Sequence, residues 1–334
     1  MPENSNFAYA IGRIRAIEKR LLDKGKFDRM IDSKSPEEAL KVIAEAGYNE
    51  SSAFSGNISD YESMLKEEEK RLYALLKEIS SNSEVFDIFL LKNDYHNIKV
   101  MLKSEFLGIE TDNGLLNAGT IPISNMKMVI IDRNFIKLPI YMKESIEEAL
   151  DNFSKTKDPR QIDLILDSAY YAHIVELSSK SGYIYLKKLV EVMIDMTNIK
   201  TYLRIRNLNM TLDLLKKSLI PGGTMEDSVF FSNFGKSLDE LLEKTKKTKY
   251  YNILSEGIES HAKHGSFSKL EKLADDYIIN IVKKTKYNTF GIEPLIGYLI
   301  AKETEIKNLR IVMVGKINNI SNDIIRERLR KSYV

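Results

Sequence analysis

A helical segment that recurs at intervals of about a hundred residues is the feature of this sequence that most constrains its fold. The three copies share an Ile-Lys pair, which occurs at Asn97-Ile98-Lys99, Asn198-Ile199-Lys200 and Glu305-Ile306-Lys307. An apolar residue stands seven positions before each Ile (Leu91, Val192 and Leu299) and another stands three positions after it (Met101, Tyr202 and Leu309). This spacing is typical of one buried face of an α-helix.

We therefore predict that the three Ile residues occupy equivalent buried positions in three similar helical modules, because self-similarity at a fixed period indicates repeated structural units. A second landmark upstream supports the repeat, at Glu38-Ala39-Leu40-Lys41, Glu148-Ala149-Leu150-Asp151 and Glu240-Leu241-Leu242-Glu243. In this alignment the third copy has Glu305 where the first two have Asn, and Lys302 where they have Asp94 and Asp195. These differences indicate that the modules are not interchangeable.

Two breaks in the helical pattern predict the module boundaries. Residues 108–125 carry Gly108, Gly114, Gly119 and Pro122 with little periodicity, and Pro221-Gly222-Gly223 interrupts the chain again. We expect helical modules at residues 1–115, 116–221 and 222–334.

The local signals favour an all-α fold. Seven prolines in 334 residues are few, which suits long helices. Ser35-Pro36-Glu37-Glu38 is a typical helix start, with Ser as the N-cap, Pro in the first helical position and acidic residues in the first turn. The run Met128-Val129-Ile130-Ile131 has the composition of a strand, but no partner strand is evident, so we interpret it as the start of the second module.

Composition excludes several classes of function. Lys and Arg (50) are interleaved with Asp and Glu (48), and a net charge of +2 argues against a nucleic-acid-binding protein. The absence of Cys excludes disulfides and thiolate chemistry. We expect no secretory signal in residues 1–20 and no membrane span, because no charge-free apolar stretch reaches about 18 residues. The chain is expected to be soluble and could still lie against a membrane protein.

We predict no catalytic, cofactor or metal site. Gly235-Lys236-Ser237 resembles the end of a phosphate-binding loop, but Phe230 stands where that pattern requires Gly, so a helix capped near Ser237 is the preferred interpretation. His261 and His264 have the spacing of two metal ligands on a helix, but no Cys or obvious carboxylate companion is near, which favours solvent-exposed histidines.

Two further patterns leave alternatives open. A Lys-rich run could dock an acidic partner or anionic head groups, or it could be a solvated helix face; it comprises Lys244, Lys246, Lys247 and Lys249. The pairs Tyr170-Tyr171 and Tyr250-Tyr251 could anchor an interface or pack at the edge of the core.

The two ends of the chain carry motifs of a known family. The C-terminal motif comprises Ala301-Lys302-Glu303-Thr304-Glu305-Ile306-Lys307-Asn308-Leu309-Arg310, Gly315-Lys316, Ile325-Arg326-Glu327-Arg328-Leu329 and Ser332-Tyr333-Val334. The N-terminal motif is Tyr9-Ala10-Ile11-Gly12-Arg13-Ile14-Arg15. Together they resemble the C subunits of the archaeal/vacuolar-type (A/V-type) rotary ATPases and ATP synthases, the counterparts of the d subunit of the eukaryotic V-ATPase.

This resemblance implies a funnel-shaped, all-α protein of three modules around a pseudo-threefold axis. Such a protein lies on the cytoplasmic face of the membrane as a peripheral part of the complex. It seats the central stalk on the proteolipid rotor ring and transmits torque for ATP-coupled proton or sodium transport, without catalysing a reaction itself. Its implied partners are therefore the central-stalk subunits and the rotor ring.

Two other functions remain compatible with the residues alone. The first is an independent α-helical repeat scaffold for binding proteins, although such repeats usually have a period of about 20–50 residues. The second is a helical enzyme that uses scattered Asp and Glu side chains.

The basic C-terminal residues are the predicted partner contact. They comprise Arg326, Arg328, Arg330 and Lys331. Salt bridges within the third module are an equally good interpretation of the same residues.

Overall fold

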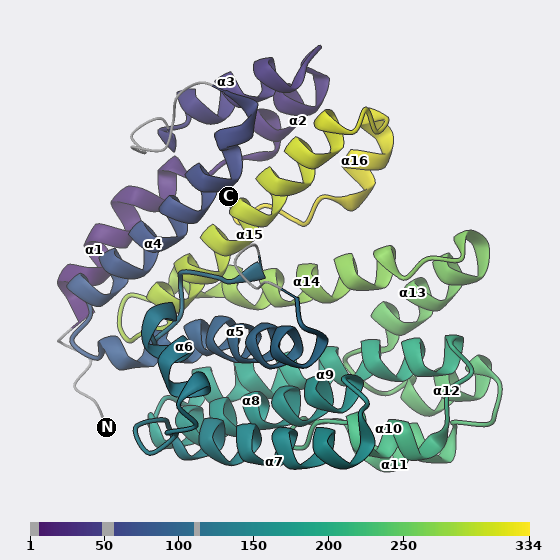
Figure 1. Cartoon of the computed structure of the whole chain (residues 1–334). Coiled ribbons are helices and arrows are strands. Elements are labelled where there is room, and N and C mark those ends of the chain that lie inside the picture. The colour runs from purple at the N-terminus through teal and green to yellow at the C-terminus, as the bar shows by residue number, and fades with distance from the viewer. Residues whose placement is uncertain (1–6, 49–56, 110–113) are drawn as a thin grey trace. The chain divides into compact units, whose positions relative to one another are not determined.

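The computed structural model describes residues 7–48, 57–109 and 114–334, and these residues form helices and no strand. The all-α prediction is therefore confirmed for this part of the chain. The helices divide into two compact units (Figure 1). One unit combines residues 1–83 with residues 236–334, and the other comprises residues 84–235.

The unit built from both ends of the chain is organised around one long helix, α15 (Glu293–Ile317). Its neighbours include α1 (Ala8–Ile17), α2 (Lys24–Asp32), α3 (Pro36–Glu45), α4 (Tyr61–Ile79), α14 (Ser268–Lys283) and α16 (Asn322–Arg328). The unit also contains α12 (Leu238–Thr245), α13 (Tyr251–His264) and the 3₁₀ turns Glu18–Arg20, Ile58–Asp60 and Lys284–Tyr287. Helix α15 is buried on several faces because it is surrounded in this way.

A continuous apolar core joins the N-terminal helices of this unit to α15 and α16. Phe27, Met30 and Leu40 from the first helices lie in the same cluster as Leu309 and Ile325. The N-terminal segment thus packs against residues nearly three hundred positions further along the chain.

The second unit is a set of helices in which α8 (Arg160–Lys180) contacts three other long helices. This helix packs against α5 (Asp87–Leu107), α7 (Ile140–Thr156) and α9 (Ile184–Asn207). The shorter elements are α6 (Ile123–Ile131), α10 (Leu212–Ser218), α11 (Asp227–Ser232) and the 3₁₀ turn Ser83–Phe86, which begins in the other unit. The run Met128-Val129-Ile130-Ile131 is helical and belongs to α6.

Several helix starts follow their local sequence. The Ser35 hydroxyl accepts a hydrogen bond from the Glu38 backbone N–H (3.3 Å), and Pro36 opens α3, so the predicted start is confirmed. Ser237 caps α12 in the same way, accepting from the Glu240 N–H (3.3 Å), which confirms the preferred interpretation of that segment.

The helices α5, α9 and α15 share one C-terminal geometry. Each ends near a residue in the left-handed region, namely Gly108 (φ 64°), Asn209 (φ 50°) and Asn319 (φ 52°). The next N–H reaches back five residues in every case, from Ile109 to Ser104 (3.0 Å), Met210 to Ile205 (3.0 Å) and Ile320 to Gly315 (2.9 Å). This pattern caps carbonyl groups that have no partner within the helix.

An Asn eleven residues before each left-handed residue makes a second repeated contact. The Asn97 amide donates to the Leu116 carbonyl (2.9 Å) and accepts from the Leu116 N–H (2.8 Å). Asn198 binds Ile220 through the same two bonds (2.8 and 2.9 Å), and Asn308 binds Arg330 (3.0 and 2.9 Å). The three amides therefore clamp the segment that follows each helix.

The third copy of the repeat is consequently shifted by three residues from the predicted alignment. Asn308, and not Glu305, corresponds to Asn97 and Asn198, so the residue equivalent to Ile98 and Ile199 is Leu309. The predicted alignment was wrong because a three-residue shift on a helix keeps nearly the same face buried. Burial itself is confirmed, since Ile98, Ile199 and Ile306 are all at most 4% exposed.

The boundaries of the three predicted modules stay predictions, as does the pseudo-threefold funnel. They divide the chain by its sequence repeat, whereas the two compact units divide it by packing. Residues 110–113 of the predicted 108–125 break lie outside the described residues.

Candidate functional site

The acidic residue three positions before each clamping Asn distinguishes the copies chemically. In the first two copies it is Asp94 or Asp195, and both are fully buried. Asp94 accepts hydrogen bonds from the Thr120 N–H (2.8 Å), the Thr120 hydroxyl (2.7 Å) and the Ile121 N–H (3.1 Å). Burial raises the pKa of Asp94, and these three donors oppose the rise.

Asp195 repeats this arrangement on the segment that follows α9. It accepts from the Thr224 N–H (2.7 Å), the Thr224 hydroxyl (2.5 Å) and the Met225 N–H (3.0 Å). A Gly precedes each Thr for a steric reason, because an added Cβ would lie 2.1 Å from an Asp94 oxygen at Gly119 and 2.3 Å from an Asp195 oxygen at Gly223.

Glu305 takes the same position in the third copy but binds a different part of the chain. Its carboxylate accepts from the Leu22 N–H, the Tyr48 hydroxyl (2.6 Å) and the Lys302 ammonium (2.7 Å). The predicted correspondence of Glu305 with Asn, and of Lys302 with Asp94 and Asp195, is thus wrong by one helical turn. Glu305 corresponds to the two Asp residues, and its longer side chain reaches the N-terminal segment.

Lys302 lies at the centre of this buried network. Its ammonium pairs with Glu305 (2.7 Å) and Glu68 (3.0 Å) and lies 4.4 Å from the centre of the Tyr48 ring. Burial by itself lowers the pKa of Lys302, but the two carboxylates raise it overall. Burial and the charge of Glu305 also raise the pKa of Tyr48 well above its usual range. The network ties the N-terminal helices to α15 through fully engaged polar groups.

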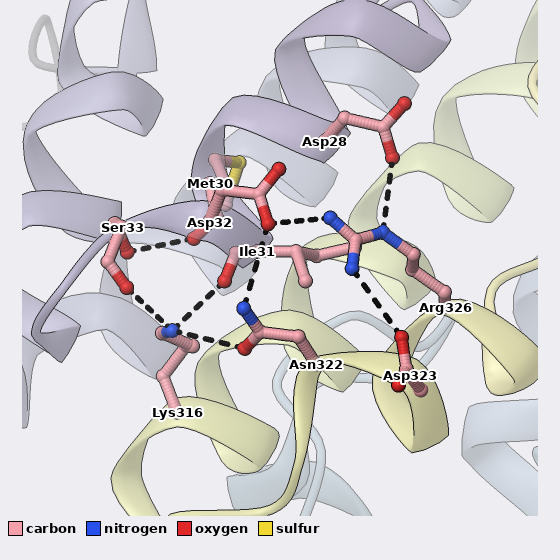
Figure 2. A network of polar contacts seen from close by, with 9 residues as sticks. All are labelled: Asp28, Met30, Ile31, Asp32, Ser33, Lys316, Asn322, Asp323 and Arg326. Atoms are coloured by element: carbon pink, nitrogen blue, oxygen red, sulfur yellow. Dashed lines mark hydrogen bonds and ion pairs between the residues drawn. The ribbon is translucent and has the colours of Figure 1, made fainter.

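Other residues of the C-terminal motif make structural contacts within the same unit. Arg310 forms a bidentate ion pair with Glu62 of α4 (2.9 and 2.8 Å). The Lys316 ammonium donates to the carbonyls of Ile31 (2.8 Å) and Ser33 (2.6 Å) at the end of α2, as Figure 2 shows. A cation at this helix end satisfies carbonyls that lack a helical partner. Sequence reasoning missed these roles because the partners lie at the opposite end of the chain.

The four predicted contact residues have two different environments. Arg326 ion-pairs with Asp32 (2.5 Å), Asp28 (3.6 Å) and Asp323 (3.7 Å), as Figure 2 shows. Arg330 pairs with Asp275 (2.8 Å), and its side chain is only 10% exposed. Arg328 and Lys331 are exposed. Salt bridges within the third module thus account for Arg330, whereas Asp28 and Asp32, the nearest partners of Arg326, belong to the predicted first module. The partner contact stays a prediction.

The histidines lie in structural environments. His173 is buried, its ring stacks on Tyr141 (5.3 Å between ring centres), and burial lowers its pKa. His264 is exposed as predicted, but His261 is half-buried and stacks on Phe267 (3.9 Å) because the chain turns back after Gly265. Within the described residues, no group of three or more His, Asp or Glu is placed to hold a metal ion.

The Lys-rich run and the tyrosine pair that follows it differ in exposure. All four lysines are exposed; Lys246 also pairs with Glu243 (3.3 Å), and Lys249 lies over the Tyr250 ring (4.9 Å). Tyr250 is 1% exposed, which favours core packing for that residue.

None of the helices in the described part of the chain is long and apolar enough to cross a membrane. The family model described as ATP synthase (C/AC39) subunit matches residues 10–328. The chain belongs to this family. The resemblance to the C subunits of the A/V-type rotary ATPases is thereby confirmed.

Curated members of the family align along nearly the whole chain. The C subunit of the V-type sodium ATPase of Enterococcus hirae is 27% identical, covering 96% of this chain and 97% of the relative. The C subunit of the A-type ATP synthase of Methanocaldococcus jannaschii is 28% identical, covering 97% of this chain and 86% of the relative. The C subunit of the A-type ATP synthase of Methanosphaera stadtmanae is 25% identical, covering 97% of this chain and 87% of the relative.

Proposed function

We propose that this chain is the non-catalytic component that seats the central stalk of an A/V-type rotary ATPase on the membrane proteolipid ring. The observation that carries the proposal is the family match over residues 10–328, together with relatives named as C subunits of V-type and A-type enzymes. In this role the chain lies on the cytoplasmic face of the membrane, as a peripheral part of the complex. It transmits torque between stalk and ring and thereby couples ATP synthesis or hydrolysis to proton or sodium transport.

The packing supports a mechanical role. A protein that transmits torque must resist deformation, and its resistance comes from contacts that join distant segments. Here the buried pair of Lys302 and Glu305 holds the N-terminal segment on α15, and the Arg310–Glu62 pair holds α4 on the same helix. These charged groups of α15 are thus engaged in structural contacts within the unit.

Deleting the gene tests the coupling role directly. Without the connector, the catalytic head is expected to retain ATP hydrolysis, while ATP-driven ion transport into membrane vesicles stops because stalk rotation no longer reaches the ring. Re-expression of the full chain is the control and should restore transport. A deletion strain that transports ions at the normal rate would refute the proposal.

Co-purification separates this role from an independent scaffold. A rotor component is expected to recover stalk and ring subunits in fixed ratio on a native gel. Recovery of unrelated proteins without ATPase subunits would favour the scaffold.

A further inference from the structure

A cavity of about 460 Å³ lies within the unit built from both ends of the chain. Its walls come from α2, α14, α16 and the segment that follows α16. Six cationic side chains line it: Lys24, Lys272, Lys283, Arg326, Arg330 and Lys331. Asp28 is the one acidic residue in the lining described for this cavity. Such a strong imbalance of charge favours an anionic occupant.

The positive charge is only partly neutralised within the chain. Arg326 and Arg330 have carboxylate partners, whereas the Lys272 ammonium donates to a backbone carbonyl, that of Glu327 (3.0 Å). For Lys24, Lys283 and Lys331 the described residues supply no side-chain hydrogen bond or ion pair. Asp276 lies near Lys331, but its carboxylate accepts the Lys331 backbone N–H (2.6 Å).

The direction of the pKa shift of Lys272 agrees with an excess of positive charge in the cavity. Burial lowers the pKa of this ammonium, and the charges of Lys269 and Arg330 lower it further, against the opposing effects of Asp276 and Glu327. An added anion would relieve the repulsion among these cations.

The cavity also has apolar walls, which narrows the class of occupant. Leu329 is half-buried and Val334 is exposed, and both line the cavity beside Phe27, which is itself buried. A bare inorganic anion would use the cations alone and leave these surfaces wet. A peptide with carboxylates next to an apolar side chain would use both, and pockets of about 300–1,000 Å³ are large enough for a ligand group of this size. Buried apolar anchors with charged contacts around them are how protein interfaces gain affinity and specificity.

We propose that this basic cavity docks an acidic peptide segment of another protein of the complex, which places an apolar side chain against Leu329 and Val334 and two or more carboxylates among Lys24, Lys283 and Lys331. The inference rests on the proposed function, since it supplies the complex that contains the partner. It refines the predicted contact: Lys331 belongs to the docking site, and Arg328 lies outside the cavity lining.

Site-specific cross-linking in the intact complex tests this site. The chain has no Cys, so Ser332→Cys gives a single attachment point for a photoreactive maleimide at the cavity wall. Ser81→Cys, at an exposed position outside the cavity, is the matched control. We expect the probe at position 332 to capture a peptide of net negative charge that contains an apolar residue, with a yield that falls as salt rises. Capture of a neutral or basic segment, of lipid, or of nothing beyond the control would overturn the proposal.

Charge reversal identifies the cations that bind. Adding Lys24→Glu and Lys283→Glu to the Ser332→Cys chain is expected to reduce the cross-linked product by roughly tenfold, because two attractive contacts become repulsive. Lys41→Glu with Lys66→Glu makes the same change of charge at exposed positions of the same unit outside the cavity and should leave the yield unaltered. Equal yields from the two double variants would refute the cavity as the docking site.

Co-purification distinguishes a failure of the docking proposal from a failure of the proposed function. A chain that co-purifies with stalk and ring subunits, but whose position 332 captures no acidic segment, refutes the cavity proposal and leaves the proposed function standing. A chain that fails to co-purify with them refutes both.

Discussion

At the scale of single residues, buried polar side chains define the three copies of the repeat more sharply than the apolar ones do. Asn97, Asn198 and Asn308 each make two hydrogen bonds to one backbone unit. An apolar residue in any of these places would leave a peptide group without partners, and a buried polar group without a partner costs more than a missing apolar contact of similar size.

We expect Asn308→Ala to lower the free energy of unfolding by about 1–3 kcal/mol, because the Arg330 N–H and carbonyl lose their partners. Urea denaturation followed by circular dichroism measures the change. Asn318→Ala is the control, since Asn318 is exposed and bonds only to its own helix, and should stay within about 0.5 kcal/mol of the parent. Equal effects at the two positions would contradict a structural role for the clamp.

The buried network of Lys302, Glu305 and Tyr48 predicts alkaline sensitivity. The pKa values of Lys302 and Tyr48 are both raised by folding, so their contribution to stability is complete below their ordinary values of 10.5 and 10.0. It is lost as pH rises through the higher folded values, because the unfolded chain then releases protons more readily. The double variant Lys302→Met/Tyr48→Phe should be less stable near neutral pH and lose less of its stability above pH 10 than the parent.

Melting temperatures between pH 8 and 11 measure this difference. Lys244→Met replaces an exposed lysine in the same unit and controls for general alkaline denaturation, so it should follow the parent. Parallel curves for the parent and the double variant would rule out the network as a source of the pH dependence.

At the scale of elements, the segments that follow α5 and α9 can pack against these helices because each contains a glycine at its closest approach. Gly119 and Gly223 let the segments after α5 and α9 approach the carboxylates of Asp94 and Asp195 closely enough to donate backbone hydrogen bonds. The Gly residues in the predicted breaks therefore do more than interrupt a helix. They leave space for the buried carboxylates of Asp94 and Asp195.

Gly119→Ala is expected to destabilise the fold by about 1–3 kcal/mol, because the new Cβ would meet an Asp94 oxygen at 2.1 Å and the turn would have to move. Gly12→Ala is a control with the opposite sign. Gly12 lies inside α1 with nothing within 4 Å of an added Cβ, so Ala should stabilise the helix by about 0.5–1 kcal/mol. Thermal unfolding of both variants measures these changes in stability. An unchanged stability of Gly119→Ala would show that the turn tolerates a side chain.

At the scale of the whole molecule, one compact unit is built from both ends of the chain, and this connectivity affects how the unit folds. Residues 1–83 and 236–334 share one core, and the polar contacts at Glu305, Arg310 and Lys316 all reach back to the first segment. Contacts this distant in sequence slow folding, and this unit can be completed only after residues 236–334 have been synthesised.

Two arginines near the C-terminus separate folding from assembly. Arg326→Glu should lower the melting temperature of the isolated chain, because it brings a carboxylate beside Asp28 and Asp32. Arg328→Glu should leave the melting temperature unchanged, since Arg328 is exposed. If Arg328 contacts a partner, this second variant reduces recovery with the ATPase subunits on a native gel; undiminished recovery would remove Arg328 from the predicted contact.

Much of the local structure could be predicted from the sequence. Apolar periodicity and capping residues predicted an all-α fold, the start of α3 at Ser35 and the burial of Ile98, Ile199 and Ile306, because each depends on neighbours within a turn or two of helix. The terminal motifs were sufficient for the family, since they preserve a set of residues whose spacing is unusual.

The tertiary structure alone decided which residues correspond and which pairs meet. Moving the third copy by three residues leaves its buried face nearly unchanged, so periodicity could not distinguish Glu305 from Asn308, whereas the hydrogen bonds of Asn308 do. Glu305 meets Leu22 and Tyr48, and Lys316 meets Ile31, only because the chain folds its first helices onto α15. Apolar burial fixes which face of a helix turns inward, but the partner of a buried charge depends on the path of the chain.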